Sequence, residues 1–70
     1  MTNFVQALTQ RQTQVVALVI KGYSNKEIAR VLHISDGTVK LHLHAVYERL
    51  NVTSRGKLTH AMIGAEGDQQ

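Results

Sequence analysis

The fold of this chain is decided by residues 24–40, which read SNKEIARVLHISDGTVK. Ser24 followed by Glu27 is a capping box, and Ser35 with Asp36 directly after it is a second helix-start signal. Between the two signals, apolar side chains recur at the spacing of one helix face. The stretch therefore predicts two helices joined by a short turn, which is the arrangement of a helix-turn-helix.

Similar signals predict a further helix on each side of this stretch. Thr9 followed by Gln12 forms a capping-box pattern before an apolar segment, and Gly22 ends that helix. Ser54 caps the last helix, which we expect to fray at Gly64. No segment shows the alternation of a strand. The prediction is an all-α four-helix bundle whose second and third helices form the helix-turn-helix, with the third as the recognition helix.

The length of 70 residues is sufficient for one small domain. We assign residues 1–7 to a lead-in or linker, residues 8–64 to the domain and residues 65–70 to a flexible tail. The absence of cysteine excludes disulfides and thiolate metal sites and fits a cytoplasmic protein. No apolar run approaches the roughly 18 residues of a membrane span, so no membrane partner is expected.

The charge balance favours a polyanionic partner. Eight Lys and Arg against five Asp and Glu give a net charge of +3, and two of the acids, Glu66 and Asp68, lie in the expected tail. The other residues therefore carry eight basic and three acidic side chains. A small domain with this surplus is suited to nucleic acid, although many soluble domains reach the same surplus for solubility alone.

The predicted third helix divides its side chains between two faces. At about 100° per residue, one narrow apolar stripe is formed by Val39, Leu43, Val46 and Leu50. The opposite side carries Gly37, Leu41 and Glu48, with His44 and Ala45 somewhat to one side, and Lys40 flanks one edge of the stripe. Small and hydrogen-bonding residues there allow close approach to base edges, where Lys and His donate to guanine and Leu contacts a thymine methyl. This helix therefore predicts reading of the DNA major groove.

Several motifs follow one another in residues 8–63, namely Leu8-Thr9-x-Arg11, Gly22-x-Ser24-Asn25-Lys26-Glu27-Ile28-Ala29, His33-Ile34-Ser35, Thr38-Val39-Lys40-x-His42 and Leu50-Asn51-Val52 followed by Arg55. In these motifs and their spacing the chain resembles the DNA-binding domain of the LuxR/FixJ/GerE group of bacterial transcription regulators. The resemblance implies a four-helix domain whose third helix enters the major groove and whose fourth helix forms a homodimer contact.

The resemblance also implies roles for particular residues. The positions that contact bases correspond to Lys40, Leu41 and His44. The positions that contact phosphates correspond to Ser24, Asn25, Lys26, Thr38 and Arg55. His42 joins the phosphate set, with a hydrogen bond inside the domain as an equal alternative. The dimer contact is expected to use Leu58, Thr59, Met62 and Ile63.

The expected function is sequence-specific binding of double-stranded DNA in the major groove, which regulates bacterial transcription. The chain would act as the C-terminal effector domain of a larger regulator, such as a response regulator, or as a small stand-alone regulator. The alternative is a helix-turn-helix that docks on RNA polymerase or on a partner regulator. Lys40 and the basic start of the second helix favour DNA, whereas an exposed Leu41 favours a protein partner.

Catalysis, metal binding and cofactors are not expected. No carboxylate is placed to build a Ser-His-Asp triad, and the five glycines are dispersed instead of forming a phosphate loop. His42 and His44 are two residues apart on a helix and do not face one ion.

Asp36 and Gly37 are unusual at the start of a recognition helix, and His33 tolerates a positive φ if the turn requires it.

Overall fold

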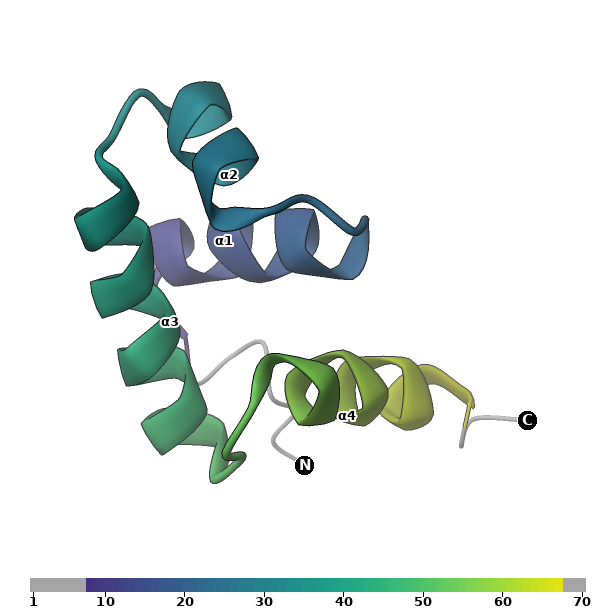
Figure 1. Ribbon diagram of the computed structural model, residues 1–70. Helices are drawn as coiled ribbons and strands as arrows, with labels where there is room; N and C mark the ends of the chain where they lie inside the picture. The colour runs from purple at the N-terminus through teal and green to yellow at the C-terminus, as the bar shows by residue number, and fades with distance from the viewer. Residues whose placement is uncertain (1–7, 68–70) are drawn as a thin grey trace.

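The computed structural model describes residues 8–67, with side chains described through residue 63. This part of the chain forms α1 (Gln10–Ile20), α2 (Asn25–Leu32), α3 (Asp36–Leu50) and α4 (Arg55–Gly67), and it contains no strand (Figure 1). The all-α prediction, with α2 and α3 as the helix-turn-helix, is confirmed. None of these helices combines the length and the apolar character that crossing a bilayer demands.

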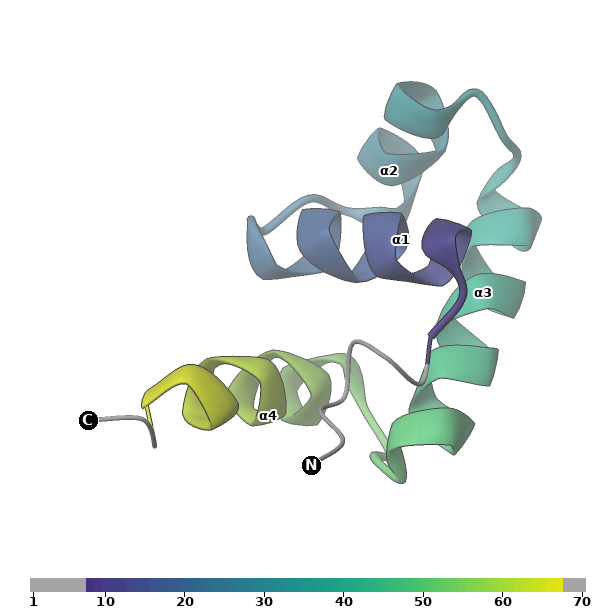
Figure 2. The ribbon, with the colours of Figure 1, turned by 180° about the vertical axis from the view of Figure 1, so that it is seen from behind.

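Helix α3 is the element against which α1 and α2 assemble. Both α1 and α2 pack against α3, and α4 packs against α1. Figures 1 and 2 show α2 beside the N-terminal end of α3, α1 across its middle and α4 beside its C-terminal end. One long side of α3, facing away from α1 and α4, is left uncovered by the other helices (Figure 1).

Each helix begins after a hydroxyl residue that caps its first turn. The four caps are Thr9, Ser24, Ser35 and Ser54. In every case the side-chain oxygen accepts a hydrogen bond from the backbone N–H three residues later, at 3.1 to 3.2 Å. These bonds satisfy donors that a helix leaves open at its first turn. The predicted helix starts are confirmed because capping depends only on residues close together in the chain.

Helices α1, α2 and α3 end in the same backbone motif. The residue that turns the chain out of each helix has a positive φ, which is 94° at Gly22 and 58° at both His33 and Asn51. The next N–H donates to the carbonyl five residues earlier, as Ile34 does to Ala29 at 3.0 Å. That next residue is apolar in all three helices, and Tyr23, Ile34 and Val52 pack against the core. The turn between α2 and α3 thus does require a positive φ at His33, a conformation that histidine tolerates.

The core lies between α1, α2 and α3 and is completed by one residue of α4. Its buried apolar members are Val15, Val16, Val19, Ile28, Ala29, Val39, Leu43, Val46 and Leu58. The predicted stripe of α3 is confirmed, since three of its four residues are buried and Leu50 packs against them. Leu58 is 0% exposed, so its assignment to the dimer contact is wrong. Its side chain lies inside its own domain because α4 packs against α1.

Helix α4 is longer than expected. It continues through Gly64 to Gly67, so the expected fraying at Gly64 is wrong. One glycine inside a helix costs only about 1 kcal/mol relative to alanine, which does not suffice to end this helix. Residues 65–67 therefore belong to α4 and not to a tail, while residues 1–7 and 68–70 lie outside the described part.

Candidate nucleic-acid interface

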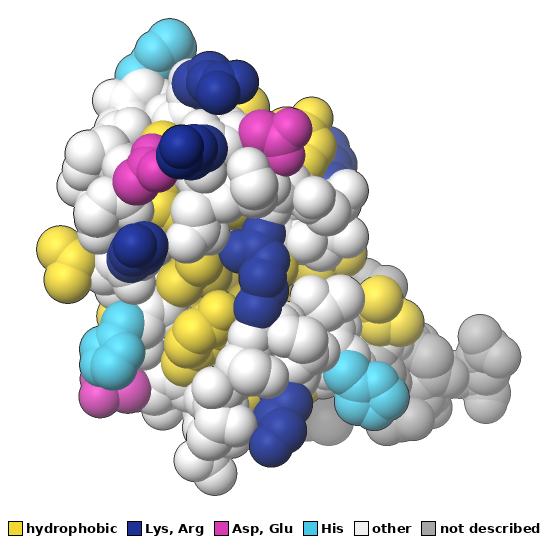
Figure 3. All heavy atoms as spheres, in the orientation of Figure 1, with side chains coloured by type: hydrophobic (Ala, Val, Ile, Leu, Met, Phe, Trp, Pro, Cys, Tyr) yellow, Lys and Arg dark blue, Asp and Glu magenta, His cyan; other side chains and the backbone are white. Residues whose placement is uncertain are grey.

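The uncovered side of α3 carries the three residues expected to contact bases. Lys40 and His44 are exposed, and Leu41 is 72% exposed, more than any other large apolar residue in the described part. On the same side of the molecule, Lys and Arg side chains lie over α2, beside α3 and near the start of α4 (Figure 3). The helix spacing places the three predicted residues on one face.

Glu48, which the sequence places on this face without a role, lies beside His44. The Nε2 atom of His44 lies 3.5 Å from Oε2 of Glu48, one helical turn later, and both side chains are about three-quarters exposed. The i,i+4 spacing of the two residues is the signal that predicts such a pair. The Glu48 carboxylate is an acceptor, so the Nε2 atom of His44 is within reach of a partner on its own helix.

Gly37 lies on the same face, one turn before Lys40 and Leu41. A Cβ built on Gly37 would meet only the Oγ atom of Ser35, at 3.9 Å, which is an ordinary contact. Gly37 also lacks a positive φ. Packing within the domain therefore does not require glycine here.

The start of α2 is the second part of the candidate interface. Ser24 and Glu27 form a reciprocal capping box, with bonds of 3.2 and 2.8 Å. Hydrogen bonding to the backbone N–H of Ser24, followed by bonding to its side chain, holds the pKa of the Glu27 carboxyl below its ordinary value. The N–H groups of Asn25 and Lys26 have no partner within α2, because helix geometry leaves the first N–H groups open. Such a turn is suited to an anion.

Arg55 is directed towards its own domain. Its Nη1 atom donates to Oδ1 of Asn25 at 2.9 Å, and its Nη2 atom donates to the backbone carbonyl of Tyr23. The side chain is half-buried as a result. These hydrogen bonds favour an indirect role over the direct phosphate contact that the resemblance implies. No local pattern in the sequence signals a contact between residues 30 positions apart.

Thr38 and His42 lie on the flank of α3 away from Lys40 and are both half-buried. The N–H of Thr38 donates to the Oγ atom of Ser35 at 3.1 Å, and the two hydroxyls lie 2.9 Å apart. The Thr38 hydroxyl therefore takes part in capping α3, with hydrogen-bonding capacity remaining for a phosphate. For His42, a phosphate contact and a hydrogen bond inside the domain both stay predictions.

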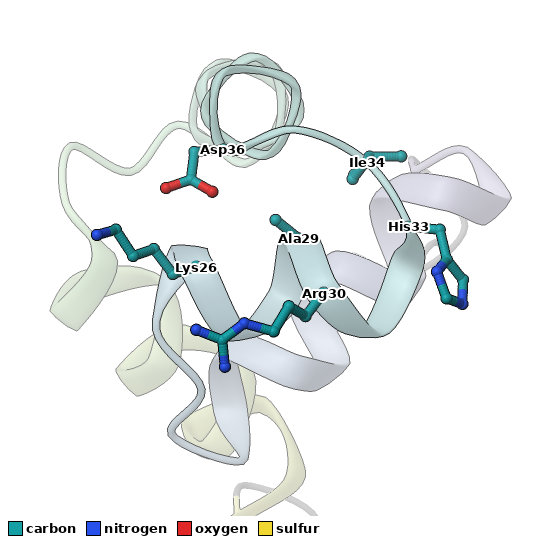
Figure 4. Close-up of a pocket in the computed structure, with 6 residues that line it drawn as sticks. All are labelled: Lys26, Ala29, Arg30, His33, Ile34 and Asp36. Atoms are coloured by element: carbon teal, nitrogen blue, oxygen red, sulfur yellow. The ribbon is translucent and has the colours of Figure 1, made fainter.

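An open hollow of about 650 Å³ separates α2 from the start of α3. Its lining consists of Lys26, Ala29, Arg30, His33, Ile34 and Asp36 (Figure 4). The Asp36 carboxylate points from the start of α3 towards α2, while Lys26 and Arg30 extend from α2 (Figure 4). Asp36 thus lies opposite two basic side chains, which offset its repulsion of a phosphate. Arg30 was not among the predicted residues, although it follows Lys26 by four positions on one helix face.

The residues expected at the dimer contact differ in what they offer a second chain. Thr59 and Met62 are half-buried, and Met62 packs against the core. Ile63 is 54% exposed. With Leu58 in the core, the apolar surface left on this part of α4 is centred on Ile63.

Comparison with known proteins agrees with this architecture. Residues 6–62 match the sequence model of the family described as bacterial regulatory proteins, luxR family. Over 51 residues the chain is 47% identical to YhjB of Escherichia coli, named as an HTH-type transcriptional regulator; the match covers 73% of the chain and 26% of YhjB.

Two further relatives carry more specific names. The nitrate/nitrite response regulator protein NarP of Escherichia coli is 42% identical over 62 residues, which are 89% of the chain and 29% of NarP. The HTH-type transcriptional regulator MalT of Vibrio campbellii is 42% identical over 48 residues, which are 69% of the chain and 5% of MalT. The chain thus spans less than a third of each relative. Since the family model matches most of its length, the chain belongs to the luxR family of bacterial regulatory proteins.

Proposed function

We propose that this chain binds double-stranded DNA by placing α3 in the major groove and that it regulates bacterial transcription in this way. The observation that carries the proposal is the uncovered side of α3, which presents Lys40, Leu41 and His44 together. The names of the relatives support a regulatory role. The domain would act as the C-terminal effector of a larger regulator or as a small stand-alone regulator.

Base reading is assigned to three side chains with different chemistry. Lys40 donates to N7 and O6 of guanine, and Leu41 contacts a thymine methyl group. His44 donates to an acceptor on a base edge, and Glu48 lies beside it on the same face. Together these groups discriminate bases, whereas a face of Lys and Arg alone would attract any phosphate backbone.

Phosphate binding is assigned to the starts of α2 and α3. Ser24 offers its hydroxyl, while Asn25 and Lys26 supply open backbone N–H groups, a side-chain amide and a charge. The dipole of α2 adds to their attraction for an anion. Thr38 and His42 contact the backbone from the other flank of α3. Arg30 lines the hollow beside Lys26 and extends the basic surface along α2.

A homodimer through α4 would place two recognition helices about 34 Å apart, one turn of DNA. Ile63 is the exposed apolar residue available for this contact. The expected binding site is then a palindrome with half-sites one turn apart. Regulation by such a dimer occurs in the cytoplasm, with RNA polymerase as the further partner.

Selection of binding sites from random duplexes tests the proposal. We expect an enriched palindromic site. Lys40→Ala should lose about 1–3 kcal/mol of discrimination at one base pair. Lys26→Ala should weaken the selected site and random DNA by the same factor, since phosphates carry no sequence information. Failure to enrich any site, or equal losses on both kinds of DNA for Lys40→Ala, would contradict base reading by α3.

A further inference from the structure

We propose that Arg55 is a positioning residue for DNA binding, which holds Asn25 in the orientation that donates to a DNA phosphate. The inference rests on the proposed function and concerns how its phosphate contact is built. Arg55 is the first residue of α4, and Asn25 is the first residue of α2. One side chain thus connects the start of the last helix to the start of the helix-turn-helix.

The guanidinium group of Arg55 forms hydrogen bonds to the residues before and after Ser24, the cap of α2. Its two terminal nitrogens donate to Oδ1 of Asn25 and to the carbonyl oxygen of Tyr23, and these residues flank Ser24. A guanidinium group is a planar fork with a fixed separation between donors, so it suits two acceptors held at different places. A lysine ammonium group lacks this fork.

This contact determines which end of the Asn25 amide is free. An asparagine side chain has one acceptor oxygen and one NH₂ donor. Arg55 only donates, so it binds the oxygen and leaves the NH₂ group of Asn25 available. The backbone N–H groups of Asn25 and Lys26 are open at the same turn. The NH₂ group of Asn25 and these two N–H groups therefore present donors together at the first turn of α2, as binding a phosphate requires.

The alternative is that Arg55 itself contacts a phosphate. Two observations favour the positioning role: the side chain is half-buried, and two of its donor nitrogens are already bound to acceptors in the domain. The two roles differ in salt dependence. A cation that neutralises a phosphate contributes about 0.9 to the slope of log K against log salt, whereas a positioning residue contributes nothing.

The test is a double-mutant cycle with Arg55→Gln and Asn25→Ala, in which binding to a duplex of random sequence is measured by fluorescence anisotropy at several salt concentrations. Circular dichroism confirms that each variant is folded at the assay temperature. We expect each single change to weaken binding roughly tenfold, as for one charge-assisted hydrogen bond. The double variant should be no weaker than Arg55→Gln, and the salt slope should stay unchanged.

Two further variants make the result decisive. Arg11→Gln removes the same charge from an exposed site on α1 and should change affinity by less than about twofold. Arg55→Lys keeps the charge but not the fork, so it should bind as weakly as Arg55→Gln, and it replaces Arg55→Gln in the cycle if that variant is unfolded. Rescue by Lys, additive losses and a lower salt slope would overturn the proposal in favour of direct phosphate contact.

Unchanged affinity in folded Arg55→Gln would equally overturn it, because Arg55 would then serve the fold alone. A parent chain that does not bind the duplex at all would refute the proposed function. The ¹⁵N spectrum gives a readout without DNA, in which the side-chain NH₂ resonances of Asn25 should shift in Arg55→Gln and not in Arg11→Gln.

Discussion

Shortening Leu58 to alanine tests whether this residue belongs to the core or to a contact between two chains. Leu58 is 0% exposed and is the only residue of α4 in the buried core of the described part. A fully buried Leu→Ala change costs about 3 kcal/mol or more through lost transfer energy and the cavity left behind. A chain of this length has about 4–10 kcal/mol of stability in total, so Leu58→Ala should lose a third of it or more.

The measurement is urea denaturation followed by circular dichroism at two protein concentrations. In a thermal melt the same loss of stability lowers Tm by roughly 12–24 °C, at about 4–8 °C per kcal/mol. Ile63→Ala is the matched control on the same helix, because Ile63 is 54% exposed and its truncation should cost about 1 kcal/mol or less. The core assignment is refuted if Leu58→Ala loses under about 1 kcal/mol, or if its loss disappears when the protein is diluted.

Three other perturbations have expected outcomes. Gly22→Ala should lower Tm, because it places a side chain at a φ of 94° at a cost of about 1–2 kcal/mol. Gly37→Ala should raise the stability by up to about 1 kcal/mol, because Gly37 has an ordinary φ and open space around its Cα. Thermal melts that rank the two variants in the opposite order would contradict the argument. The depressed pKa of Glu27 stabilises the fold above the unfolded-state pKa of about 4.3, and this stability is lost as pH falls through the folded pKa. Acid titration of Glu27→Gln should therefore show a smaller loss than the parent, and identical curves would count against the effect. Lys26→Ala should lower the salt slope of DNA binding by about 0.9, and an unchanged slope would remove Lys26 from the phosphate contacts.

The local features of this chain could be read from its sequence. The caps at Thr9, Ser24, Ser35 and Ser54 were predictable because each hydrogen bond joins residues three positions apart. The buried stripe of α3 was predictable because its apolar residues repeat with the helical period. The outward placement of Lys40, Leu41 and His44 follows from the same periodicity, since the face opposite a buried stripe is exposed.

The errors concern α4. Leu58, Ala61 and Met62 recur at the spacing of one helix face, but that pattern does not say whether the face packs inside the domain or against a second chain. Leu58 was assigned to a dimer contact but lies in the core. The end of the helix was placed at Gly64 because glycine is a poor helix former, but its cost is small against continued hydrogen bonding, and α4 extends to Gly67.

By itself, the sequence determined where the helices start, the turn at His33 and the face of α3 that is left exposed, because these depend on short-range hydrogen bonds and on helical periodicity. Only the tertiary structure decided that Leu58 is buried, that Arg55 holds Asn25, and that Asp36 lies over a hollow opposite Lys26 and Arg30. The physical reason is that these contacts join different helices. They depend on how the helices pack against one another, which the pattern within any single helix does not contain.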